Sequence, residues 1–165
     1  MSALISPCGL YRYRLDREIA KPLGDQVFAF FGVNPSTADA SLDDATVRKW
    51  RGFTERNDGQ RFIVGNVFAF RATDVGVLGI ADDACGPDND RYLAEIIEEA
   101  DILVPCWGNT NKVPAHLRNR FNTVALMLMG ACRPVKIFGR CANGDPKHPL
   151  MLGYNTPLIP AWEPK

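Results

Sequence analysis

The chain has no excess of charge of either sign and few of the residues on which metal and disulfide sites depend. Its 165 residues carry 19 Lys and Arg against 19 Asp and Glu, so the formal net charge is zero. No global field therefore attracts the protein to a polyanion or a membrane surface, and any such site must be a local patch. The five cysteines are an odd number without a C-x-x-C spacing, which argues against a zinc ribbon or a disulfide framework.

Long apolar runs are also missing. No stretch approaches the roughly 18 apolar residues of a membrane span, and the first ten residues lack the basic and then apolar pattern of a signal peptide. With 46% hydrophobic residues the chain is large enough for one core. We expect a single domain over residues 1–165, in a monomeric, cytoplasmic protein that contacts no membrane.

Several signatures of nucleotide and ester chemistry are absent. There is no G-x-x-x-x-G-K-[ST] phosphate loop, no G-x-G-x-x-G fingerprint and no G-x-S-x-G elbow. The sequence therefore lacks the motifs typical of phosphate-loop enzymes, dinucleotide-binding enzymes and serine hydrolases of the α/β class.

What the sequence does contain is an alternation of apolar strands and amphipathic helices. Strands are expected over about 26–33, 62–70, 101–108 and 135–139, and helices over about 44–56, 91–100 and 114–129. This alternation is typical of a parallel sheet with helices on both faces. We predict an α/β three-layer sandwich around a central four-stranded parallel sheet, with the alternating segment 11–15 as an edge strand.

Polar residues follow these strands where each one ends. Asn34 follows the apolar run 28–33, Asn66 lies within the second strand, Asn109 follows the third, and His148 lies in a proline-braced loop after the fourth. The carboxyl ends of parallel strands meet at one edge of a sheet, where open α/β folds bind ligands. We expect these four residues to share one crevice. The alternative is that each is an ordinary turn residue or strand cap.

Two charged groups allow two interpretations each. The densest basic region includes Arg48 and Lys49 and either contacts phosphates or forms a solvated helix face. The adjacent Asp43 and Asp44 form either a metal or acid pair or the acidic start of a helix, and the second interpretation is favoured.

Four segments together resemble the uracil-DNA glycosylase superfamily. They are Gly32-Val33-Asn34-Pro35-Ser36, Val64-Gly65-Asn66-Val67, Leu103-Val104-Pro105-Cys106-Trp107-Gly108-Asn109 and His148-Pro149-Leu150. Nearly the whole chain after about residue 10 is also similar to a bacterial and phage family known only as domain of unknown function 1643. Its link to glycosylases is at the level of fold and two short motifs, so fold transfers better than activity.

The resemblance implies a monofunctional DNA glycosylase that flips a nucleotide out of DNA and hydrolyses the bond between base and sugar, without a metal or another cofactor. Asn34 would position the attacking water and His148 would stabilise charge on the departing base. Asn66 would bind the base edge, and Phe53 or Trp50 would stack on it. The remaining base-binding residues would be Gly32, Val33, Pro35, Ser36, Arg71, Asp74 and Asn109. Contacts to DNA would come from Arg48, Lys49, Arg140, Lys147, Leu150 and Met151, the last two as apolar wedges.

One departure from the resemblance concerns the substrate. Uracil-specific enzymes carry an aromatic residue in the first motif, whereas Ser36, Thr37 and Ala38 are small. With Arg71 and Asp74 nearby, this predicts a pyrimidine with a polar group on carbon 5, such as a hydroxymethylated or glycosylated base of phage DNA, as well as uracil. Restriction of phage DNA or repair would be the setting. The alternatives are a non-catalytic nucleic-acid or nucleotide-binding module, or another enzyme of modified-nucleotide metabolism on the same fold.

Overall fold

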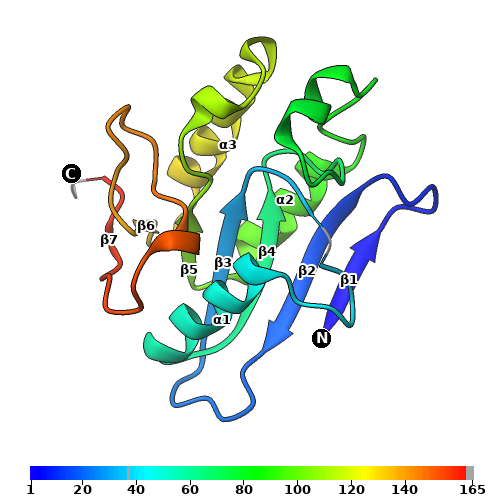
Figure 1. Cartoon of the computed structure of the whole chain (residues 1–165). Helices are drawn as coiled ribbons and strands as arrows, with labels where there is room; N and C mark the ends of the chain where they lie inside the picture. The colour runs from blue at the N-terminus through cyan, green and yellow to red at the C-terminus, as the bar shows by residue number, and fades with distance from the viewer. Residues whose placement is uncertain (37, 163–165) are drawn as a thin grey trace.

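The computed structural model describes residues 1–36 and 38–162, and Figure 1 shows the course of the chain. A five-stranded sheet lies at its centre, in the order β1-β2-β4-β3-β5. The strands are β1 (Ser2–Ile5), β2 (Arg12–Glu18), β3 (Gln26–Gly32), β4 (Gly59–Asn66) and β5 (Ile102–Pro105). The helices are α1 (Ala45–Arg56), α2 (Asn89–Glu99) and α3 (Asn119–Gly130), with 3₁₀ turns at Val75–Ile80, Thr110–Lys112, Ala115–Leu117 and Pro149–Met151. A separate short pair consists of β6 (Lys136–Ile137) and β7 (Ile159–Pro160).

The sheet differs from the predicted four parallel strands. Only β4, β3 and β5 run parallel, while β2 pairs antiparallel with β4, and β1 antiparallel with β2. Of the expected fourth strand only the two residues of β6 are formed, and they pair with β7. The segment is joined to the main sheet by an isolated bridge between Val135 and Leu103. Pro134 lacks the N–H that would extend this pairing, and Gly139 turns the chain away at φ 105°. The expected edge strand at 11–15 is part of β2, which β1 covers.

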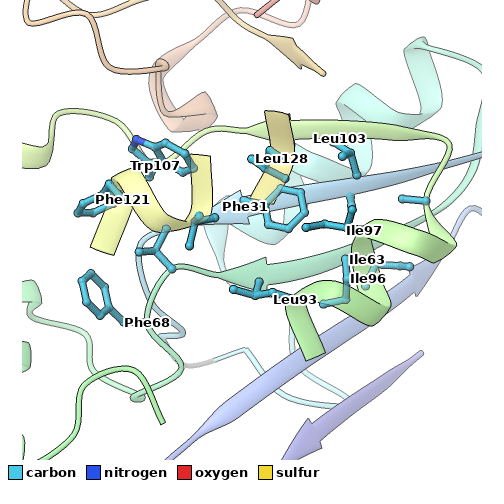
Figure 2. Packing of buried hydrophobic residues seen from close by; sticks show 14 of the residues in the cluster. Phe31, Ile63, Phe68, Leu93, Ile96, Ile97, Leu103, Trp107, Phe121 and Leu128 are labelled. Carbon is cyan, nitrogen blue, oxygen red and sulfur yellow. The ribbon is translucent and has the colours of Figure 1, made fainter. Parts of the chain in front are cut away.

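Helices pack on both faces of the sheet because the strand side chains alternate. Phe28 and Phe30 of β3 face the cluster beneath α1, while Ala29 and Phe31 face the cluster beneath α2 and α3. Figure 2 shows the second cluster, where Phe31 lies among apolar side chains from the sheet and from both helices. The predicted three-layer arrangement is thus present, with α1 on one side and α2 and α3 on the other (Figure 1).

The helix boundaries follow local signals with one exception. Asp44 caps α1, its carboxylate accepting from the Val47 N–H at 2.9 Å. The helix expected over 114–129 divides into a 3₁₀ turn and α3, because the N–H groups of Leu117 and Arg118 bond three residues back, to Pro114 and Ala115. No helix in the described residues is long and apolar enough to cross a membrane.

The two crossovers leave the sheet on opposite faces. The connection from β3 to β4 carries α1 over one face, and that from β4 to β5 carries α2 over the other. The chain therefore diverges above the carboxyl ends of β3 and β4, where Gly32 and Asn66 stand opposite each other in the pairing register. In open α/β sheets a crevice forms at such a switch point.

Candidate functional site

A cleft of about 780 Å³ opens at the carboxyl ends of β3, β4 and β5, within the usual range of about 300–1,000 Å³ for small-molecule sites. The four polar residues expected to converge, Asn34, Asn66, Asn109 and His148, all contribute to its wall. The N-terminus of α1 and the loop ending at Leu152 complete the rim. The parallel strands β3, β4 and β5 thus bring Asn34, Asn66 and Asn109 together, while His148 joins them from a loop after β6, which lies outside the parallel sheet.

Asn66 is a buried amide without a partner. The residue is only 2% exposed, and its Nδ2 has no hydrogen-bond acceptor among the described residues. An unpaired buried donor typically costs about 1–3 kcal/mol. The neighbouring Asn89, 1% exposed, instead donates from Nδ2 to the backbone oxygens of Asn66 and Val67, both at 3.1 Å. Asn89 therefore fixes the end of β4, while the Asn66 Nδ2 stays unpaired at the base of the cleft.

Gly32 lets the Asn66 amide sit against the backbone of β3. A Cβ at position 32 would lie 3.0 Å from Asn66 Oδ1 and 3.5 Å from Trp50 Cη2. We expect Gly32→Ala to shift the amide by tenths of an ångström and to lower the activity proposed below about tenfold, with little change in melting temperature. The matched control is Gly130→Ala, where a Cβ meets nothing within 4 Å. Unchanged activity in the Gly32 variant would contradict a positioned amide.

Asn34 has a fixed orientation. Its Nδ2 donates to the carbonyl oxygens of Ala72 at 2.7 Å and Pro35 at 3.1 Å, with Phe70 at 3.5 Å. Because these acceptors identify the nitrogen end, the oxygen Oδ1 is directed elsewhere, and no described residue donates to it. Asn34 thus braces the loop after β4 and retains an acceptor at the cleft.

His148 is held as a neutral imidazole with one free donor. Its Nδ1 accepts from the Leu150 N–H at 3.2 Å, which leaves the proton of the neutral ring on Nε2. Burial, and secondarily the positive charge of Lys112, lower the pKa of His148 below its ordinary 6.5, against an opposing effect of Asp44. Gly108, at φ 76°, allows close packing, since a Cβ there would lie 3.1 Å from the His148 Cβ.

Asn109 behaves as a turn residue. It is exposed, and its Oδ1 accepts from the Asn111 N–H at 2.8 Å and from Asn143 Nδ2 at 3.0 Å. The side chain lines the cleft but uses its acceptor to cap the 3₁₀ turn that follows. These hydrogen bonds are those of a turn or cap residue, and they agree with the cap interpretation of Asn109.

The stacking assignment to Phe53 is corrected. Phe53 is 1% exposed and packs against Phe138 at 4.4 Å and Tyr154 at 5.3 Å between ring centroids, so it is a core residue outside the cleft wall. Trp50 does line the cleft, held by its Nε1 donating to Cys106 Sγ at 3.3 Å. Sequence reasoning missed Trp107, which also lines the cleft and whose buried Nε1 has no partner among the described residues. Figure 2 shows this indole at the margin of the core cluster.

The wall of small residues is also different from that expected. Ser36 and Val33 line the cleft, but Ala38 is fully buried in the cluster beneath α1, and Thr37 lies outside the described residues. Pro35 is buried and accepts from the Ala72 N–H.

The polar residues after β4 are not all at the cleft. Arg71 donates to the Gly9 carbonyl at 3.2 Å, and Asp74 accepts from the Gly76 N–H at 2.8 Å as a cap. Neither belongs to the cleft wall. Thr73, between them, does line it.

The basic residues expected at DNA divide into two groups. Arg48, Lys49 and Arg140 donate to backbone carbonyls of the protein itself, at Asp43, at Leu152, and at Gly144 and Ala161, respectively. None of the three lines the cleft. Lys147, Leu150 and Met151 do, and Met151 is 90% exposed. Lys112, which sequence reasoning missed, joins them in the wall.

Arg12 is a third lining residue that sequence reasoning missed, after Trp107 and Lys112. It is 2% exposed and lines the cleft from the start of β2. The alternation of tyrosine and arginine over residues 11–14 indicated a strand, but nothing in it indicated that this arginine faces a site.

No group of His, Cys, Asp and Glu in the described residues is arranged to hold a metal ion. Asp43 pairs with Arg17 at 2.6 Å and Arg51 at 2.9 Å, and these bonds lower the pKa of its carboxyl despite burial. Asp44 caps α1. The favoured interpretation, a helix start, thus describes Asp44, whereas Asp43 forms ion pairs with two arginines instead.

Comparison with known protein families yields a match over most of the chain. A protein family described as "Protein of unknown function (DUF1643)" matches residues 12–150. No curated protein and no solved structure matches the chain. The matched range includes β2 through His148 and therefore every strand that contributes to the cleft.

Proposed function

The chain belongs to the DUF1643 family, whose description carries no activity, and we propose from the cleft itself that it is a DNA N-glycosylase. Its substrate would be uracil or a modified pyrimidine, turned out of DNA, with an abasic site as the product. The observation that carries the proposal is the buried Asn66 amide, unpaired at the switch point of the sheet, in the same cleft wall as His148. A pyrimidine edge offers the carbonyl acceptor that this amide lacks.

The chemistry needs only water and these side chains. In the hydrolysis the bond between C1′ and the base nitrogen breaks, and its electron pair leaves with the base. Water supplies hydroxide to C1′ and a proton to the base. Asn34 Oδ1 accepts from the attacking water and so orients it, and His148 Nε2–H donates to the base oxygen on which negative charge develops. Asn34 is too weak a base to ionise the water, so catalysis depends on preorganised electrostatics.

The order of the segments along the chain supports kinship with the uracil-DNA glycosylase superfamily as part of this proposal. The asparagine of the first segment, the asparagine of the second and the histidine of the last all line one cleft. Lys147, exposed Met151 and Leu150 at the rim suit a phosphate contact and apolar wedges against a distorted duplex. The cleft volume also leaves room for a substituent on the base.

A second candidate is hydrolysis of a free modified nucleotide. The observation that favours it is that Arg48, Lys49 and Arg140 bond to the protein's own carbonyls, which leaves few free cations for a long stretch of DNA. The same cleft chemistry would then act on a mononucleotide.

The test of both candidates is a release assay. The protein is incubated with DNAs that contain uracil, hydroxymethylated or glycosylated pyrimidines, and with the corresponding free nucleotides. Alkaline cleavage reports abasic sites, and chromatography identifies the released base. Base release from DNA supports the first candidate, and release from nucleotides alone supports the second. Binding without release in any sample would show a non-catalytic module.

The pH dependence follows from the state of His148. Since its pKa lies below 6.5, the ring stays neutral at pH 7 and remains the active form down to mildly acidic pH. We expect activity to be constant from pH 8 to about 6.5 and to fall only below that, as Nδ1 gains a proton and loses its bond from Leu150. The residual activity of His148→Gln should lack this acid limb. An acid limb retained by that variant would assign the titration to another group.

A further inference from the structure

Arg12 carries a buried positive charge that the fold leaves without a counterion. Its Nη1 donates to the Ala38 carbonyl at 2.5 Å, while Nε has no acceptor among the described residues. No described carboxylate forms an ion pair with it. Burial lowers the pKa of this guanidinium to about 10, an effect that Asp44 opposes only through space. The group remains a cation at neutral pH.

The other fully buried arginine shows how this fold normally compensates such a charge. Arg17, in the same strand, donates from Nε to Asp43 Oδ1 at 2.6 Å and from its remaining nitrogens to backbone carbonyls. Buried cations are expected to be paired in this way. Arg12, by contrast, is a buried cation with no carboxylate partner among the described residues.

Arg12 shares the cleft wall with the N-terminus of α1. Ala45 and Thr46, the first residues of this 12-residue helix, line the same cleft. The first N–H groups of a helix have no partner within the helix, and the helix dipole adds partial positive charge there. Arg12 is bonded to the loop that leads into α1, because its Nη1 donates to the Ala38 carbonyl. Two independent features that favour an anion thus face one end of the cleft.

The remaining charges of the cleft agree with this. Lys112 and Lys147 are the other cations in its wall, and Asp44 is the one carboxylate among the described lining residues. That carboxylate already accepts from the Val47 N–H.

We propose that Arg12 and the N-terminus of α1 form an oxyanion subsite that takes a phosphate group of the ligand. It lies where the start of β2 meets the loop before α1, in the same cleft wall as Asn66 at the end of β4. A ligand that bridges the two is a nucleotide, with its base at Asn66 and a phosphate at Arg12. The subsite stands on charge and burial, and does not depend on whether the glycosidic bond is cleaved.

The test measures phosphate binding alone. Inorganic phosphate at low millimolar concentration, at constant ionic strength set with chloride, should raise the melting temperature of the native protein by roughly 2–6 °C. Arg12→Met should abolish this rise yet fold, because replacing an unpaired buried cation by an apolar side chain of similar size is neutral or stabilising. Arg12→Lys, which keeps charge but not the planar fork, should retain part of the rise.

Two controls keep the result interpretable. Arg91→Gln, at an exposed position of α2, should show the full phosphate effect. Arg17→Met should melt lower because Asp43 loses the closer of its two arginine partners. An equal rise in the native protein and in Arg12→Met, or no rise in the native protein, would overturn the subsite. Base release is measured in a separate assay. If no base is released, the phosphate result still tests the subsite by itself.

Discussion

Replacing Asn66 by leucine is expected to abolish most activity while making the protein more stable. The variant loses the donor that meets the base, and a missing donor in a preorganised site typically costs about 10²–10³ in rate. It also removes a buried amide whose Nδ2 is unpaired, and relief of such a group is worth about 1–3 kcal/mol. The measurement combines single-turnover base release with thermal or urea unfolding.

The matched control is Asn89→Leu. Asn89 is buried to the same degree, but its Nδ2 bonds two backbone carbonyls at the end of β4. Its removal takes this donor from the Asn66 carbonyl, while the Val67 carbonyl keeps Arg120 Nε at 3.1 Å, so this variant should melt lower. Asn66 would be a structural residue if Asn66→Leu also melted lower, and the proposed base contact would then fail.

Replacing Asn34 by alanine should lower both rate and stability. The rate should fall about 10²–10³-fold because the attacking water loses the acceptor that orients it. Stability should fall by about 1–3 kcal/mol, because the Ala72 carbonyl loses the Asn34 donor, while the Pro35 carbonyl keeps only the Ala72 N–H. Sequence alone suggests a loop residue whose truncation leaves folding nearly intact, but these bonds tie it to the segment after β4.

Two measurements separate the roles of Asn34. Rates are compared well below both melting temperatures, so that the variant is fully folded, and affinity for an uncleaved substrate analogue is measured alongside. A role in orienting water predicts lost turnover with retained binding. If binding and turnover fell together, Asn34 would act only by bracing the wall of the cleft.

The unpaired donors of the cleft also restrict the ligand. Arg12 Nε, Asn66 Nδ2 and Trp107 Nε1 are buried N–H groups without acceptors in the described part of the chain, and all three residues line the cleft. A ligand rich in oxygen acceptors, such as a pyrimidine with two carbonyls and a phosphate, relieves them. An amino group at the position facing Asn66 Nδ2 would oppose a donor to a donor, which disfavours a base of the cytosine type.

The sequence by itself determined the layers of the fold and the position of the cleft. Apolar runs that end in glycine or asparagine, separated by amphipathic helices, specify parallel strands with helices on both faces. The carboxyl ends of such strands coincide, so Asn34 and Asn66 had to meet, whereas His148 reaches the same cleft from a loop after β6, outside the parallel sheet. These features are local in sequence or follow from topology, and for that reason they were predictable.

Only the tertiary structure decided which side chains face the cleft and which charges are compensated. Phe53 and Trp50 lie three residues apart on one helix, and the packing of Phe138 and Tyr154 sends the first into the core. Arg12 and Arg17 occupy the same strand, yet only Arg17 has a carboxylate within reach, supplied by Asp43 from 26 residues further along the chain. Partners that distant are brought together by packing, and no local pattern encodes them.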